Sequence, residues 1–234
     1  MKANQTDYNT IFSEINKLMH ESNFVEAKSI LQSMDENQIS VSDRFFYYNA
    51  LSETILKTHT DDNQFYEALK YLEKSVDYLK DDDQKSTIYG NIAVYLLQKN
   101  KIDDAQKYLD QCFNFASSEV SKTFAYKIQG RILFLKNSLE DSLDSFTEAS
   151  FYAEKTHNEL MLFYITLEIA TVFEKLNLLR IAFSECDRAE KYARSLRDGV
   201  SFYRCIVYKA QLLYKLGMEN EVKKLITGTN KIFD

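Results

Sequence analysis

The chain has 234 residues, no proline, only five glycines, 45% hydrophobic residues and a net charge of −6. The lack of proline and glycine favours helices joined by short turns, and the acidic balance argues against binding nucleic acid, which needs a basic face. No apolar run resembles a signal peptide or approaches the roughly 18 residues of a membrane helix, so we expect a cytoplasmic protein with no membrane partner.

A small residue returns along the chain at intervals of 37 to 41 residues, at Ala27, Ala68, Ala105, Ser142, Ala182 and, as valine, Val222. A period in this range is typical of arrays of helical pairs. Residues that accept a left-handed turn stand five positions before the last five of these, at Asn63, Asn100, Asn137, Asn177 and Gly217. Residues fit to pack follow each small residue by four positions: Leu31, Leu72, Leu109, Phe146, Cys186 and Ile226. The pattern predicts one unit used six times.

The first two units are irregular. Unit 7–35 has Ile15 where a small residue is expected, as is common in terminal repeats that cap a stack. Unit 43–80 aligns with the others only if about four residues of THTDDNQ are inserted in its turn. We expect that loop to protrude, with Asp61 and Asp62 in water.

The later units, 84–117, 119–156, 158–197 and 199–231, follow the pattern more closely. Apolar residues spaced three and four apart mark one face of each helix, as in amphipathic helices. The predicted helices are 7–21, 24–35, 43–59, 65–80, 84–99, 102–117, 119–136, 139–156, 158–176, 179–197, 199–216 and 219–231. We predict a single all-α domain over residues 1–234.

Paired small residues make the resemblance to a known family specific. Ala93 with Ala105, Gly130 with Ser142, and Ala170 with Ala182 stand where tetratricopeptide repeats (TPRs) place small residues so that two helices can cross closely. The resemblance implies an α-solenoid, a right-handed superhelix of about six tandem TPR-like hairpins. Because the period exceeds about 34 residues and the family's proline is absent, these helices should be longer than the consensus.

Enzyme signatures are absent from the sequence. It has no phosphate-binding glycine loop, GxSxG, HExxH or CxxC motif, and His20, His59 and His157 fall in three separate units. Cys112 and Cys186 occupy repeat positions expected to be buried. We therefore expect no catalytic residue, no metal and no cofactor, and a protein that is not an enzyme.

Binding is the function that the repeat architecture favours. Stacked hairpins curve so that the first helix of each unit lines a concave wall, an extended surface for a peptide or a protein segment. Aromatic side chains on this wall supply area, and amide and charged groups supply hydrogen bonds. The candidate binding residues are Asn49, Glu53, Asn91, Lys127, Arg131, Tyr164, Thr171, Arg204, Gln211 and Tyr214.

Stretches such as FFYYNALSETIL and IYGNIAVYLLQKNKIDDAQKYLDQC resemble the repeat domain of cytoplasmic peptide-pheromone receptors of the Rap, NprR and PlcR group. That resemblance implies that Asn49 and Asn91 hold a peptide backbone and that Lys127 and Arg131 meet a peptide carboxylate. Receptors of this group carry an N-terminal output module, whereas this chain begins its first repeat by about Tyr8. The chain is then either the peptide-sensing part of a regulator, or a stand-alone adaptor or homodimeric scaffold for a folded partner. In the second case Ile232 and Phe233 are the expected dimer contacts.

Overall fold

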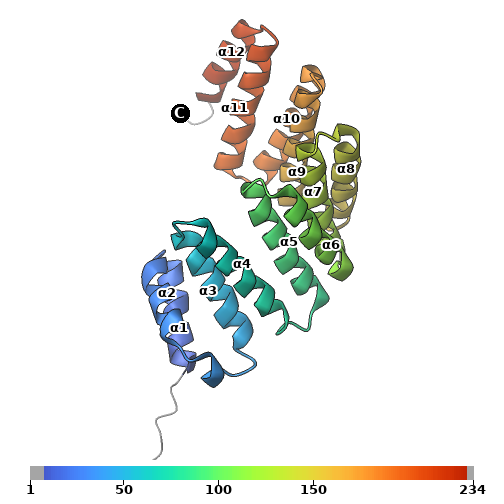
Figure 1. The fold of residues 1–234 in the computed structure, drawn as a ribbon. Helices are drawn as coiled ribbons and strands as arrows, with labels where there is room; N and C mark the ends of the chain where they lie inside the picture. The colour runs from blue at the N-terminus through green and yellow to red at the C-terminus, as the bar shows by residue number, and fades with distance from the viewer. Residues whose placement is uncertain (1–7, 231–234) are drawn as a thin grey trace, which may run out of the picture. The chain divides into compact units, whose positions relative to one another are not determined.

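The computed structural model describes residues 8–230, which form twelve α-helices, one short 3₁₀ helix and no strand (Figure 1). The 3₁₀ helix, Glu36–Gln38, follows α2. The α-helices are α1 (Tyr8–His20), α2 (Phe24–Ser33), α3 (Arg44–Thr58), α4 (Asp62–Val76), α5 (Asp82–Gln98), α6 (Ile102–Phe115), α7 (Glu119–Leu135), α8 (Leu139–Lys155), α9 (Glu159–Lys175), α10 (Leu179–Ser195), α11 (Gly199–Lys215) and α12 (Glu219–Asn230). Each predicted helix is present, and the predicted fold class, an all-α solenoid of helical hairpins, is confirmed.

The helices group into two compact units, Met1–Ile92 and Ala93–Asp234. In the first unit, α1 packs on α2 and α3 on α4, around a core that includes Leu31, Tyr48 and Leu51. Ile15 is completely buried in this core, so a large side chain fills the place where the repeat pattern has a small one. In the second unit, α7 packs on α8, α9 on α10 and α11 on α12. The prediction of one continuous domain remains a prediction.

Left-handed residues end the first helix of most hairpins. Asn100, Asn137, Asn177 and Gly217 have φ angles of 56°, 65°, 60° and 73°, which confirms four of the five predicted turns. The prediction for Asn63 is wrong, because Asn63 lies in the first turn of α4.

The start of α4 differs from the predicted 65–80 because of a capping side chain. The Asp61 carboxylate accepts a hydrogen bond from the Gln64 backbone amide at 2.9 Å, and the helix therefore begins at Asp62. It ends at Val76. The predicted insertion is thus largely taken up by the first turn of the helix. Asp61 and Asp62 are exposed, as predicted.

Close helix crossings in the second unit use the predicted small residues. Ala93, Ala105, Ala170 and Ala182 are all completely buried. Where α7 crosses α8, the pair is Gly130 with Ser142.

Gly130 leaves no room for a larger residue. A Cβ atom there would lie 2.7 Å from two ring carbons of Phe146, and the Ser142 hydroxyl donates to the Gly130 carbonyl oxygen at 2.8 Å. The absence of a side chain at Gly130 is therefore what lets the phenyl ring and the hydroxyl approach the backbone of α7.

The last hairpin departs from the pattern. Ile226, predicted to pack, is 49% exposed, because α12 is the last described helix and lies against α11 with no later described helix to cover its other face. Val222 is half-buried. The proposed dimer contacts, Ile232 and Phe233, lie outside the described residues.

No helix among residues 8–230 combines the length and the apolar character that crossing a membrane requires.

Candidate functional site

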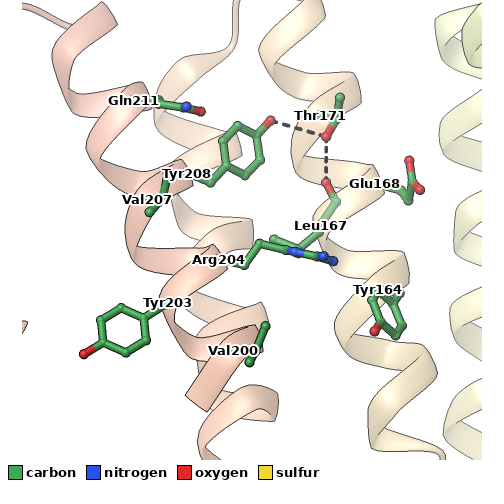
Figure 2. Close-up of a pocket in the computed structure, with 10 residues that line it drawn as sticks. All are labelled: Tyr164, Leu167, Glu168, Thr171, Val200, Tyr203, Arg204, Val207, Tyr208 and Gln211. Carbon is green, nitrogen blue, oxygen red and sulfur yellow. Dashed lines mark hydrogen bonds between the residues drawn. The ribbon is translucent and has the colours of Figure 1, made fainter. Parts of the chain in front are cut away.

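A groove of about 600 Å³ lies between α9 and α11 in the second unit (Figure 2). Each of these helices is the first of its hairpin, and the repeat pattern predicts the binding surface on those first helices. Its lining residues are Tyr164, Leu167, Glu168, Thr171, Val200, Tyr203, Arg204, Val207, Tyr208 and Gln211.

Helical spacing explains which residues of α11 reach the groove. Residues four apart lie on the same face of a helix, one turn after another. Two such rows line the groove, Val200, Arg204 and Tyr208 in one and Tyr203, Val207 and Gln211 in the other. The opposite face of the helix buries Cys205 and Ile206, which fixes the orientation of both rows.

Several apolar and aromatic side chains that line the groove are exposed to solvent. Val200 is 76% exposed and Val207 is 56% exposed, and Tyr164 and Tyr203 are also exposed. These side chains belong to one lining and are not scattered singly over the surface. Contiguous exposed apolar groups rimmed by polar ones are typical of binding sites.

Polar bonds tie α9 to α11 at one end of the groove. The Tyr208 hydroxyl donates to the Glu174 carboxylate at 2.6 Å and lies 3.4 Å from the Thr171 hydroxyl oxygen, an approach drawn in Figure 2. Lys215 also donates to Glu174. Burial raises the pKa of the Glu174 carboxyl, but the hydrogen bonds from Lys215 and Tyr208 outweigh it and hold that pKa below its ordinary value. Burial and the same bond raise the pKa of Tyr208. The bonds from Tyr208 and Lys215 to Glu174 link α9 to α11 at this end.

Two cations approach the ring of Tyr164 farther along α9. The Arg204 guanidinium lies 6.0 Å from the ring centroid and extends from α11 towards α9 (Figure 2). The Lys127 ammonium of α7 lies 5.9 Å from the same centroid and 5.5 Å from that of Phe124. Cation–π contacts of this kind contribute about 0.5 to 1 kcal/mol at exposed sites. Tyr164 is thus the residue at which α7, α9 and α11 come together.

Arg131 forms an ion pair with Glu168, which lies one turn after Tyr164 on α9, with 3.6 Å between Nε and the carboxylate oxygen. Burial lowers the pKa of the Lys127 ammonium, which Glu168 partly counteracts and Arg131 reinforces. The group around Tyr164 therefore holds three cations, Lys127, Arg131 and Arg204, and one carboxylate. This local excess of positive charge contrasts with the net charge of −6 of the whole chain.

The structure brings together six of the ten candidate binding residues: Lys127, Arg131, Tyr164, Thr171, Arg204 and Gln211. Tyr214 follows Gln211 by one helical turn, is 70% exposed and does not line the groove. Asn49 and Glu53 on α3, and Asn91 on α5, lie in the first unit, half-buried, and are not part of this groove.

Six lining residues were not among the candidates: Leu167, Glu168, Val200, Tyr203, Val207 and Tyr208. A signal for two of them was present in the sequence. Glu168 follows Tyr164 by four residues, and Tyr208 follows Arg204 by four. Extending each candidate by one helical turn would have found both.

Within residues 8–230, no three His, Cys, Asp or Glu side chains come together as metal ligands. Cys112 and Cys186 are completely buried, as predicted, and so is Cys205. Burial raises the pKa of the Cys186 thiol to about 12 and that of Cys205 to about 11, which keeps both thiols protonated.

Comparisons with known proteins find similarity in structure only. No family model matches the sequence, and no curated protein matches it. BtubC (BKLC) from P. vanneervenii has a TM-score of 0.69 at 13% identity, over 97% of this chain and 91% of that one. Aspartyl phosphate phosphatase F from Bacillus subtilis has a TM-score of 0.68 at 12% identity, over 100% of this chain and 77% of its own.

The apo form of RapI aligns with 94% of this chain and 74% of its own length, with a TM-score of 0.65 and 8% identity. Identities this low bear on the fold alone. Other similar structures are a Podosopora anserina putative kinesin light chain with nearly identical TPR-like repeats and a STAND protein with a tetratricopeptide repeat sensor from Pyrococcus horikoshii. The chain therefore has the fold of a tetratricopeptide-repeat protein and resembles the Rap-type proteins in that fold.

Proposed function

We propose that this protein is a non-enzymatic binding module that holds an extended peptide, or an extended segment of a partner protein, in the groove between α9 and α11. The proposal is carried by one observation, the strip of exposed apolar side chains with polar groups beside it. Val200 and Val207 leave most of their surface in water although they share one groove. A bound segment would cover them and gain about 25 cal/mol for each Å² of apolar surface removed from water.

The polar groups of the groove suit a peptide backbone. The Gln211 side chain is exposed and carries both a donor and an acceptor, so it can pair with a peptide unit in either sense. Thr171 is already engaged, since its hydroxyl donates to the Leu167 carbonyl oxygen at 2.9 Å. Gln211 is therefore the expected backbone contact.

The likeness to RapI supports a regulatory setting, in which a short peptide is the signal and the repeat array is the sensor. In that setting the ligand joins α9 to α11 and stabilises the packing of neighbouring hairpins. Each hairpin contacts mainly its neighbours, so a ligand that spans two of them stabilises the array locally.

The test uses a library of random heptapeptides, retained on the immobilised protein and identified by mass spectrometry. Val207→Asp should abolish retention, because it places a charge in the apolar strip. Ile181→Asp is the matched control, an exposed aliphatic residue on α10 that does not line the groove. Retention that survives Val207→Asp, or that only Ile181→Asp abolishes, would contradict the proposal.

A further inference from the structure

The chemistry of the ligand follows from the charges in the groove. The lining has two charged residues, Arg204 and Glu168. Glu168 already has an ionic partner in Arg131, at 3.6 Å. Arg204 forms no ion pair with any residue in the described part of the chain, and its guanidinium rests beside the Tyr164 ring. The Arg204 guanidinium therefore has no carboxylate of the described residues in ion-pair contact, although the hydrogen bonds that the Asp198 carboxyl accepts, and to a lesser degree the charge of Arg204, lower the pKa of that carboxyl.

The nearby carboxylates of the protein have other roles. Asp198 caps α11, where it accepts hydrogen bonds from the backbone amides of Val200 at 3.0 Å and Ser201 at 3.3 Å, and from the Ser201 hydroxyl at 2.6 Å. Glu174 is held by Tyr208 and Lys215. Releasing either carboxylate to Arg204 would break a helix cap or the link between α9 and α11.

A second cation strengthens the preference for an anion. Lys127 approaches the same Tyr164 ring from α7, and burial lowers its pKa. A ligand carboxylate close to Tyr164 would offset the cost of holding that ammonium charged. An arginine and a lysine on one aromatic residue favour a carboxylate over a neutral group.

The position of Arg204 decides where the carboxylate sits along the ligand. On α11, Val200 lies one turn before Arg204, and Tyr208 lies one turn after it. Lining residues thus continue on both sides of the guanidinium. A carboxylate held there belongs to a side chain inside the bound segment, since a chain terminus would leave half of the groove empty.

We infer that the groove takes a segment with an internal aspartate or glutamate, whose carboxylate pairs with Arg204 beside Tyr164, and with apolar residues on either side that cover Val200 and Val207. This inference rests on the proposed function and specifies its ligand. It predicts an acidic residue in the middle of an apolar stretch.

Three heptapeptide pools test the inference. All are N-acetylated and randomised among Leu, Val, Ala, Ser and Asn at every position except the fourth. The first pool has Glu at that position and an amidated C-terminus, the second has Gln and an amidated C-terminus, and the third has Gln and a free C-terminal carboxylate. The first pool should be retained about tenfold more than the other two, the gain expected of one charge-assisted hydrogen bond.

The variant Arg204→Gln should reduce retention of the first pool to that of the second. Arg180→Gln is the control, an exposed arginine on α10, and should leave the preference unchanged. Equal retention of the first and third pools would show that a terminal carboxylate binds as well as an internal one, which would contradict the inferred internal position. Equal retention of all three, still abolished by Val207→Asp, would overturn the inference and leave the proposed function standing. Failure to retain any pool would overturn both.

Discussion

Replacing Gly130 by alanine should destabilise the second unit, although alanine is the better helix former. In an ordinary helix interior, glycine to alanine stabilises by about 0.8 to 1 kcal/mol. At Gly130 the new methyl group would lie 2.7 Å from two ring carbons of Phe146 and 2.9 Å from a third. Favourable carbon contacts lie at about 3.5 to 4.0 Å, so the ring or the helix must move.

The Phe146 ring cannot move without disturbing the core. Phe146 is completely buried among the residues that join α8 and α9. Overpacking of a filled core costs about 1 to 3 kcal/mol. A shift of α7 away from α8 would also stretch the bond from the Ser142 hydroxyl to the Gly130 carbonyl, a further loss of about 0.5 to 1.5 kcal/mol. After adding both losses and subtracting the gain in helix propensity, we expect a net destabilisation of about 0.5 to 3.5 kcal/mol.

Urea denaturation followed by circular dichroism measures this effect as a lower midpoint at unchanged slope. Gly228→Ala in α12 is the matched control, because nothing lies within 4 Å of its added Cβ, and it should be neutral or slightly stabilising. Phe146→Leu should cost less in the Gly130→Ala background than alone, because the smaller side chain relieves the overlap. A Gly130→Ala midpoint at or above that of the original protein would refute the reasoning.

Three further predictions concern the core and the charges of the second unit. Ala93→Leu and Ala105→Leu should each cost about 1 to 3 kcal/mol through overpacking, and unchanged denaturation midpoints in both would mean that the repeat frame is wrong. The Cys186 thiol, with its pKa raised to about 12 by burial, should react with a thiol reagent only in denaturant, and rapid reaction of the native protein at pH 8 would contradict its burial. Burial raises the pKa of Glu190, but hydrogen bonds from Lys209 and Arg194 lower it by more, so the net pKa lies below the ordinary value of 4.5. The stabilisation from the Glu190 carboxylate is therefore present above about pH 4.5 and is lost as the pH falls through the lowered pKa. Glu190→Gln should therefore lower stability by about 1 to 3 kcal/mol at pH 7 and flatten the loss of stability in acid, and an unaltered acid profile would count against this ion pair.

The fold was predictable from the sequence because its determinants are local. Asn137 and Asn177 adopt the left-handed turns that their side chains tolerate, and Ala105 and Ala182 are completely buried where the repeat pattern expects small residues. Each hairpin contacts mainly its neighbours, so a pattern of about 40 residues contains most of the information needed to fold it. The exception, Asn63, fails because Asp61 caps α4 early and places Asn63 inside the helix.

The candidate site was predictable only in part. Placing residues on the first helix of each hairpin correctly identified Tyr164, Arg204 and Gln211 as groove residues. The spacing of Tyr208 from Arg204 could have identified it as a lining residue, but not its bond to Glu174, thirty-four residues away in the sequence. No periodicity within one helix reports which side chain of a neighbouring hairpin will accept its hydrogen bond.

The sequence by itself determined the class of fold, the number of hairpins and the residues at their crossings, since helix periodicity, turn conformation and side-chain size act over short distances. Only the tertiary structure decided that the exposed strip of Val200 and Val207 faces a groove, and that Arg204 lies beside Tyr164 without a carboxylate partner. Those features depend on how two helices about 40 residues apart are set against each other. The packing of many side chains fixes that arrangement, although each side chain constrains its neighbours only weakly. The pattern of any single helix is compatible with several arrangements of the two helices.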